Sequence, residues 1–218
     1  MELYLVRHGI AEDGGEGVRD GSRALTEKGR RRFQKTARAF GKLGRKLDLI
    51  LTSPLVRAVQ TAEILAREAR HDEVSVLEEL DPKFDADAVR EALVKRSEKR
   101  ETIALVGHEP QLSSVLAALS GVAQADLDFK KGAIVRIDVG SIADGKPADA
   151  RWWLKPRNGE RVRGLPLQKE AEKKAQADEK EQAPRKKKKK RVAKKARSSK
   201  HAAPPPAERE AAAASATA

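Results

Sequence analysis

The stretch Leu3-Tyr4-Leu5-Val6-Arg7-His8-Gly9 opens with an apolar run and ends in a guanidinium, an imidazole and a glycine. The apolar run predicts a buried β-strand, and Gly9 allows the backbone to turn sharply where a bulky group must approach. An arginine side chain binds phosphate, and a histidine side chain can attack it. This strand therefore predicts that Arg7 and His8 reach a phosphate site together.

A second apolar run, Leu49-Ile50-Leu51, predicts another short buried strand. Ser53 and Pro54 are typical of a helix N-cap and a first helical position, which places Arg57 in the first helical turn. A helix N-terminus offers free N–H groups and the positive end of its dipole to an anion. Arg57 is therefore expected where a phosphate group binds well.

A third apolar run at residues 103–106 ends in Gly107-His108, and Pro110 follows as the predicted start of a helix. Ligands of open α/β sheets bind at the carboxyl ends of the strands. Because Arg7, Arg57 and His108 each follow a predicted strand, we expect them to meet around one phosphate group.

Predicted strands and helices alternate along most of the chain, a pattern typical of a three-layer α/β/α sandwich with a mostly parallel sheet. The apolar patterns predict strands at residues 2–7, 48–52, 74–77, 102–106, 133–139 and 150–154. They predict helices at residues 26–40, 54–70, 86–96 and 110–119.

The chain resembles the histidine phosphatase superfamily, whose fold is that of phosphoglycerate mutase, and within it the short SixA-type phosphohistidine phosphatases. The resemblance covers roughly the first three quarters of the chain. It rests on Arg7-His8-Gly9, Asp20-x-x-Arg23, Leu25-Thr26-x-x-Gly29, Ser53-Pro54-x-x-Arg57-Ala58-x-Gln60-Thr61, Leu77-x-Glu79-Leu80-x-Pro82, Gly107-His108 and Trp153-x-x-Pro156.

The resemblance implies that His8 is a nucleophile, which attacks phosphorus and forms a covalent phosphohistidine. Arg7, Arg57 and His108 would surround the phosphoryl group and stabilise the charge of the transition state. Several such cations can take the neutralising role that a metal ion has in other enzymes. No Asp, Glu or His residues have the spacing of a metal site, so we expect neither a metal nor another cofactor.

Two parts of the expected site stay open at this stage. Arg23 is a further phosphate ligand by resemblance, with Asp20 orienting it or moving protons, but both also fit a loop of solvated charges. The general acid is either Glu79, which follows the second helix, or Glu109, which follows the second histidine. Glu109 also fits a purely structural role at the N-terminus of the next helix.

The segment between the second helix and the fourth strand predicts only one strand and one helix, whereas larger relatives insert a helical lid there. An open site without a lid favours a phosphorylated side chain on a protein surface, because small ligands bind in enclosed pockets. We therefore expect a phosphatase for phosphohistidine on a protein, such as a phosphotransfer domain. A small-molecule phosphomonoesterase is the alternative within the same class. A polyanion- or nucleic-acid-binding protein with an idle phosphatase domain is the alternative from another class.

The chain has 218 residues, enough for one domain with an extension. It has no cysteine, which excludes disulfides and thiolate chemistry and fits a reducing compartment. It shows neither an apolar leader before His8 nor an apolar run long enough to span a bilayer. We therefore expect a cytoplasmic protein without a membrane span, acting as a monomer.

The positive charge is concentrated at the end of the sequence. Residues 161–218 hold 18 Lys+Arg and 7 Asp+Glu, so they carry +11 of the formal net charge of +13. Lys186–Lys190 is an unbroken basic run, and nothing in this region shows an apolar pattern that could bury a core. We therefore expect a catalytic domain at residues 1–160 and a disordered basic tail at 161–218. The tail would contact nucleic acid or another polyanion without sequence specificity.

Overall fold

The computed structural model describes residues 1–169 except 99, 141 and 143–146. Its strands are β1 (Glu2–Arg7), β2 (Leu49–Thr52), β3 (Ser75–Val76), β4 (Thr102–Gly107), β5 (Ile134–Asp138), β6 (Asp149–Leu154) and β7 (Arg161–Arg163). Its α-helices are α1 (Glu27–Gly41), α2 (Val56–Ala69), α3 (Ala86–Arg96) and α4 (Gln111–Ser120). Short 3-10 helices are η1 (Asp20–Ser22), η2 (Glu78–Leu80) and η3 (Gln124–Asp126).

All seven strands form one sheet in the order β3-β2-β4-β1-β5-β6-β7. The first four strands in this order pair in parallel, and the pairs β1–β5, β5–β6 and β6–β7 are antiparallel. The sheet is therefore mixed, with its parallel half at the strands that carry the predicted site residues. The expectation of a mostly parallel sheet holds for that half, whereas β5, β6 and β7 extend the sheet in antiparallel order.

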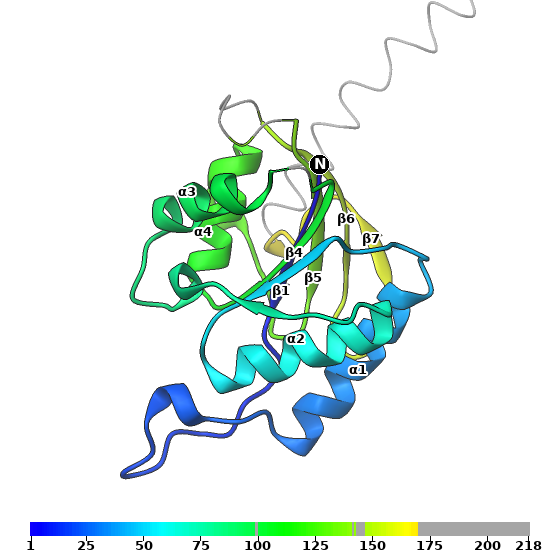
Figure 1. Cartoon of the computed structure of the whole chain (residues 1–218). Coiled ribbons are helices and arrows are strands. Elements are labelled where there is room, and N and C mark those ends of the chain that lie inside the picture. The colour runs from blue at the N-terminus through cyan, green and yellow to red at the C-terminus, as the bar shows by residue number, and fades with distance from the viewer. Residues whose placement is uncertain (99, 141, 143–146, 170–218) are drawn as a thin grey trace, which may run out of the picture. The chain divides into compact units, whose positions relative to one another are not determined.

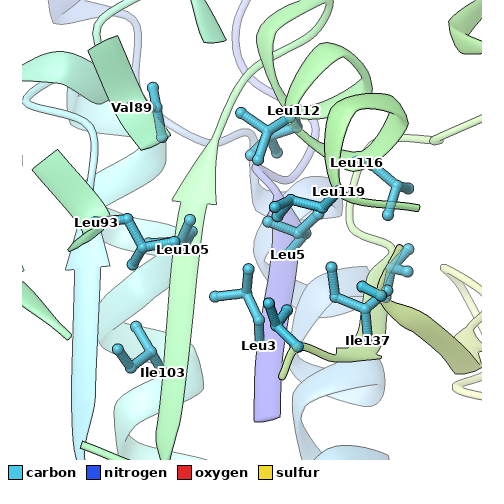
Figure 2. Packing of buried hydrophobic residues seen from close by; sticks show 14 of the residues in the cluster. Leu3, Leu5, Val89, Leu93, Ile103, Leu105, Leu112, Leu116, Leu119 and Ile137 are labelled. Atoms are coloured by element: carbon cyan, nitrogen blue, oxygen red, sulfur yellow. The ribbon is translucent and has the colours of Figure 1, made fainter. Parts of the chain in front are cut away.

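The expected three layers are present. Helices α1 and α2 cover one face of the sheet and α3 and α4 cover the other (Figure 1). The side chains of β1 alternate between the two faces, as the period of a strand requires. Tyr4 and Val6 pack with α1 and α2, whereas Leu3 and Leu5 pack with α3 and α4. Figure 2 shows the second of these cores, in which leucines of α3 and α4 meet those of β1 and β4.

Two predicted helix starts were placed too early. Helix α2 begins at Val56 and not at Pro54, and α4 begins at Gln111 and not at Pro110. The cause at α2 is that Ser53 does not cap the helix: its hydroxyl accepts a hydrogen bond from the N–H of Leu55 at 3.3 Å, inside a turn. Arg57 still lies in the first helical turn, as predicted.

The domain boundary predicted at residue 160 was also placed too early. Arg161–Arg163 form β7, which pairs with β6, and Leu167 forms a bridge with Leu127. Three residues are too few for an alternating pattern to reveal a strand. The predicted disordered tail otherwise lies outside the described residues from position 170 onward.

Candidate active site

His8 follows the last residue of β1 and is 6% exposed. Its backbone N–H donates to the carbonyl of Gly107 at 3.1 Å, which holds the end of β1 beside the end of β4. Its ring Nδ1 lies 2.7 Å from the carbonyl oxygen of Gly9, so Nδ1 carries the hydrogen and Nε2 keeps its lone pair. Burial, followed by the neighbouring His108 ring and two arginines, lowers the pKa of His8 to about 3. The ring is therefore neutral near pH 7.

His108 follows β4, and its ring centroid lies 4.8 Å from that of His8. Its Nε2 lies 2.8 Å from Oγ of Ser53, and that oxygen already accepts a hydrogen bond from Leu55. A hydroxyl oxygen can accept two hydrogen bonds, so this contact alone fits either tautomer of the His108 ring. Burial and the charge of Arg57 lower the pKa of His108 to about 3. Nδ1 is buried and has no hydrogen-bond partner among the described residues, so in the tautomer that carries the ring hydrogen on Nδ1 it is a donor available to a ligand.

Arg57 is 5% exposed in the first turn of α2. Its guanidinium donates to the backbone carbonyl of Asp20 at 2.8 Å and to the Asp20 carboxylate at 2.9 Å. The hydroxyl of Thr61 donates a hydrogen bond to the carbonyl oxygen of Arg57. The same hydroxyl oxygen accepts a hydrogen bond from the N–H of Gly9. This chain of hydrogen bonds links the start of α2 to the turn after His8.

Arg23 and Asp20 belong to the loop after β1. Arg23 pairs with the same carboxylate that Arg57 contacts and also donates to the carbonyl of Glu12 at 2.9 Å. The two arginines, Arg23 first, lower the pKa of Asp20. One carboxylate therefore bridges the two arginines that the resemblance assigns to a phosphate group. Asp20, Arg23 and Arg57 thus lie together in the structure.

A glycine in α1 holds the loop after β1 against the helix. A Cβ added at Gly29 would lie 2.0 Å from the carbonyl oxygen of Ile10, so only glycine fits this crossing. The side chain of Thr26 caps the same turn by accepting from the N–H of Gly29 at 2.8 Å. These contacts explain two residues of the Leu25-Thr26-x-x-Gly29 motif.

We call His8, His108, Arg57 and the side chains around them the cluster. Arg7 and Glu109 lie on the side of this cluster nearer to α4. Arg7 donates to the carbonyl of Phe129 at 2.6 Å, and burial lowers the pKa of its guanidinium. Glu109 accepts from the N–H and hydroxyl of Ser113 at 3.1 and 2.5 Å. Burial raises the pKa of Glu109 against the opposing effects of those hydrogen bonds and of Arg7. Glu109 is thus a carboxyl group whose proton is held more tightly than usual.

Glu79 lies in η2 with a half-buried side chain. Only its backbone joins the described hydrogen-bond network: its carbonyl accepts from Nε2 of Gln111 at 2.9 Å. The same nitrogen donates to the carbonyls of Asp81 and Phe84. The sequence analysis missed Gln111, which is 5% exposed and fastens the loop after η2 to the start of α4. Its place in the turn after Glu109-Pro110 was the only signal for this role.

A cavity of about 390 Å³ lies beside the cluster, between α1 and the loop that precedes β5. It is lined by the apolar residues Ile10 and Phe33 and by the cationic residues Lys131 and Arg157. Arg7 and Gly9, the neighbours of His8 in the chain, also line this cavity. It therefore has the size of a small-ligand pocket directly next to the cluster.

The described residues contain no group of three or more His, Cys, Asp and Glu placed to hold a metal ion. Within the same part of the chain, no helix is long and apolar enough to cross a membrane.

Comparison with known sequences finds a matching family and a similar protein. A family model described as the histidine phosphatase superfamily (branch 1) matches residues 3–82, which include β1, α1 and α2. An uncharacterized protein of Picosynechococcus is 38% identical over 143 residues, which are 65% of this chain and 87% of that protein.

Comparison with solved structures gives the same fold. The protein histidine phosphatase SixA complexed with tungstate matches with a TM-score of 0.66 and 24% identity, over 73% of this chain and all of that chain. A putative phosphohistidine phosphatase SixA from Agrobacterium tumefaciens matches with a TM-score of 0.57 and 25% identity, over 63% of this chain and 90% of its own. The fold of residues that carry the cluster is thus similar to that of SixA proteins.

Proposed function

Because the chain belongs to the histidine phosphatase superfamily, we propose that it is a phosphatase that removes phosphate from phosphohistidine on a protein, through a covalent intermediate on His8. The observation that carries this proposal is the state of the His8 ring. Its Nδ1 hydrogen is bound by the carbonyl of Gly9, and its pKa is lowered to about 3, so Nε2 is an unprotonated nucleophile at neutral pH.

In the first step, Nε2 of His8 forms a bond to phosphorus while the bond between phosphorus and the substrate imidazole breaks. Arg7, Arg57 and the Nδ1–H of His108 would bind the equatorial oxygens, where charge is spread in the transition state. Fixed donors in a buried site act strongly because they need no reorganisation during the reaction. Arg57 and His108 are buried and Arg7 is half-buried, which supports that role.

The leaving imidazole takes up a proton as it departs, and we assign this proton to Glu109. Burial raises the pKa of Glu109 despite the opposing charge of Arg7, which supports this choice. The carboxyl group of Glu79 makes no hydrogen bond among the described residues. In the second step, water attacks phosphorus, its proton passes to the Glu109 carboxylate, and the bond between phosphorus and His8 breaks. Phosphate leaves and both groups return to their starting states. Glu109→Gln should slow turnover more than Glu79→Gln does.

Substrate binding would exchange one anion for another. The Asp20 carboxylate now holds Arg57 and Arg23, and a phosphoryl group would take over part of these contacts. Asp20 is 60% exposed and can move into solvent, whereas Arg57 is buried and stays in place. Asp20 would thereby keep the arginines oriented in the absence of substrate, at the cost of competing with it.

The segment between α2 and β4 supports a protein substrate. Its described residues hold only β3, η2 and α3, and α3 packs on the sheet as part of the core in Figure 2. No described helix of this segment therefore covers the cluster, and a phosphohistidine on the surface of another protein could reach it. The absence of cysteine fits a reducing compartment, and we propose the cytoplasm as the site of action.

A panel of substrates tests this proposal. The full chain should dephosphorylate a phosphohistidine-bearing phosphotransfer domain with a higher kcat/KM than p-nitrophenyl phosphate or sugar phosphates. EDTA should leave the rate unchanged, because the cationic side chains supply the charge that a metal would otherwise supply. A strict requirement for a divalent ion, or a phosphohistidine protein left intact, would contradict the proposal.

The small-molecule phosphomonoesterase is the second candidate, and the cavity beside Arg7 and Gly9 favours it. Its volume of about 390 Å³ and its cationic lining fit a small ligand with an apolar part and a negative charge. If a small phosphate ester has the highest kcat/KM in the panel, this candidate replaces the protein phosphatase. Phe33→Trp, which should fill part of the cavity, would then lower kcat/KM for that ester.

A further inference from the structure

The two helix layers carry opposite charge. Residues 27–70, which include α1 and α2, hold 12 Lys+Arg and 4 Asp+Glu, whereas residues 71–101, which include α3, hold 6 Lys+Arg and 10 Asp+Glu. In a count of the whole domain, the net charge of −4 in the second segment offsets half of the net charge of +8 in the first. A nearly neutral domain can therefore still present a strongly basic face.

Six of the twelve basic residues of residues 27–70 line a groove of about 830 Å³ at the C-terminal ends of α1 and α2. Six of its eleven lining residues are cationic and one is acidic, namely Arg38, Lys42, Arg45, Lys46, Arg67 and Arg70 against Glu68. Such a density of one sign of charge attracts polyanions.

A second groove of about 650 Å³ continues this surface over β5, β6 and β7. It is lined by Arg45, Arg136, Arg151, Arg161 and Arg163, with Asp138 and Trp152. Arg45 lines both grooves, and Figure 1 shows the C-terminal end of α1 beside β7. We call the residues of these two grooves the basic surface.

Part of the charge of the basic surface is already neutralised. Arg38 pairs with Glu68, Arg45 with Glu2, and Arg136 and Arg151 with Asp138. The exposed side chains of Lys42, Lys46, Arg70, Arg161 and Arg163 have no carboxylate within 4 Å among the described residues. The basic surface therefore keeps an excess of exposed cations, contributed by three separate segments of the chain.

We propose that the basic surface binds the phosphodiester backbone of duplex nucleic acid, without reading its sequence. Protein interfaces usually centre on a desolvated core rich in aromatic side chains, yet the large apolar residues of the surface, Leu47 and Trp152, are 6% and 9% exposed. Single-stranded nucleic acid is held by aromatic side chains that stack on bases, and Trp152, the only aromatic residue here, is buried. A surface of guanidinium and ammonium groups without exposed apolar or aromatic side chains is best matched by the regularly spaced phosphates of a duplex.

The basic surface lies at the opposite end of the central strands from His8. Glu2 at the start of β1 pairs with Arg45 and Arg136, whereas His8 follows the end of the same strand. A duplex on the basic surface would therefore leave the cluster around His8 open to a substrate. The protein would be concentrated on nucleic acid while its candidate active site remains accessible.

The test uses the full chain and a fluorescein-labelled 20-base-pair DNA duplex, with anisotropy measured over a range of salt concentrations. The triple variant Lys42→Glu, Arg70→Glu, Arg163→Glu should bind at least tenfold more weakly near 0.1 M salt. Its log K against log[salt] plot should be flatter by up to about 3 units, because up to three phosphate contacts are lost. The matched control Arg90→Glu, Lys95→Glu, Arg96→Glu on α3 changes the net charge equally and should bind within about twofold of the parent chain.

Circular dichroism establishes that both variants are folded, and hydrogen exchange with the duplex locates the contact. Protection at residues 38–47 and 67–70 supports the proposal. Equal losses in both triple variants, or protection confined to positions after 169, would assign binding to the tail and overturn it. Equal binding of the parent chain to poly-glutamate of matched charge would overturn the nucleic-acid assignment in favour of an acidic protein partner.

Discussion

At the carboxyl ends of β1 and β4 and the start of α2, His8, His108 and Arg57 are 6%, 2% and 5% exposed. At the other end of the strands, the side chains of Arg45 and Arg151 are 44% and 50% exposed. The first group is held by hydrogen bonds to backbone and loop atoms, and the second by carboxylates at the surface. Polar groups are thus buried at one end of the sheet, whereas at the other end Arg45 and Arg151 are solvated and only Arg136, at 8% exposure, is buried among the charged residues of the basic surface.

This difference separates two uses of charge. Removing a polar group from water is costly unless partners replace the water, so a buried cluster persists only where the fold supplies those partners. Such a cluster acts strongly on a ligand because its donors are fixed and weakly screened. Exposed charges interact weakly one by one and act through their number. We therefore expect single substitutions to have large effects at the buried end and small ones at the exposed end.

The largest expected effect comes from replacing one arginine at each end. Arg57→Ala should lower kcat by about 10² to 10³, the cost of losing one fixed donor to the transition state. Arg45→Ala removes the same charge from the exposed end and should leave kcat within about twofold. Equal losses in the two variants, measured on the same phosphorylated substrate, would remove the distinction between the two ends.

A pH titration of stability tests whether the two histidines are buried in their neutral form. Their folded-state pKa values of about 3 lie below the unfolded value of about 6.5, so the unfolded state binds more protons below pH 6.5. Their contribution to stability is complete above pH 6.5 and is lost as the pH falls from 6.5 toward 3. At pH 5.5 each histidine should cost about 1.4 kcal/mol relative to pH 8.

Thermal unfolding at pH 8 and pH 5.5 measures this loss, and His8→Ala should reduce the shift in Tm by roughly half. Burial raises the pKa of Glu109, which makes an opposing contribution as the pH falls. The variant Glu109→Gln should therefore show a somewhat larger shift than the parent chain. A Tm that is the same at pH 8 and pH 5.5 would show that His8 and His108 are not buried as described.

A smaller effect is expected from Ser53→Ala, which removes the hydroxyl that contacts Nε2 of His108. In the proposed mechanism that hydroxyl donates to Nε2 and keeps the ring hydrogen on Nδ1, so kcat should fall by about tenfold, the equivalent of one hydrogen bond. Ser114→Ala is the matched control, because that hydroxyl bonds only to the carbonyl of Pro110 on the surface. Ser53→Thr should restore part of the loss, whereas a purely structural role would predict unchanged kcat and a lower Tm.

The buried end could be predicted from the sequence in large part. Arg7-His8-Gly9 and Gly107-His108 directly follow apolar runs, and Arg57 lies in the first turn of the helix after a third run, so parallel strands bring all three to the same sheet edge. Contacts between segments that are far apart in the sequence could not be predicted in this way, because no local pattern marks them. The pairing of Asp20 with Arg57 spans 37 positions, and Gln111 reaches back to Glu79 across 32.

The basic surface could not be predicted from the sequence, because its residues come from the ends of two helices and from strands near the end of the domain. A count of charges averages them with the acidic segment around α3. Strand β7 was missed for a related reason: its three residues become a strand only through pairing with β6. Surfaces assembled from distant segments need the fold before they can be recognised.

The central claim is that His8 carries the phosphoryl group during turnover, and direct labelling tests it. The full chain is mixed briefly with a ³²P-labelled phosphohistidine protein, quenched in base and digested, and the labelled peptide is sequenced. The label should lie on His8, withstand base, be lost in acid, and be absent from His8→Ala. Label that survives acid, lies on another residue or persists in His8→Ala would contradict the account.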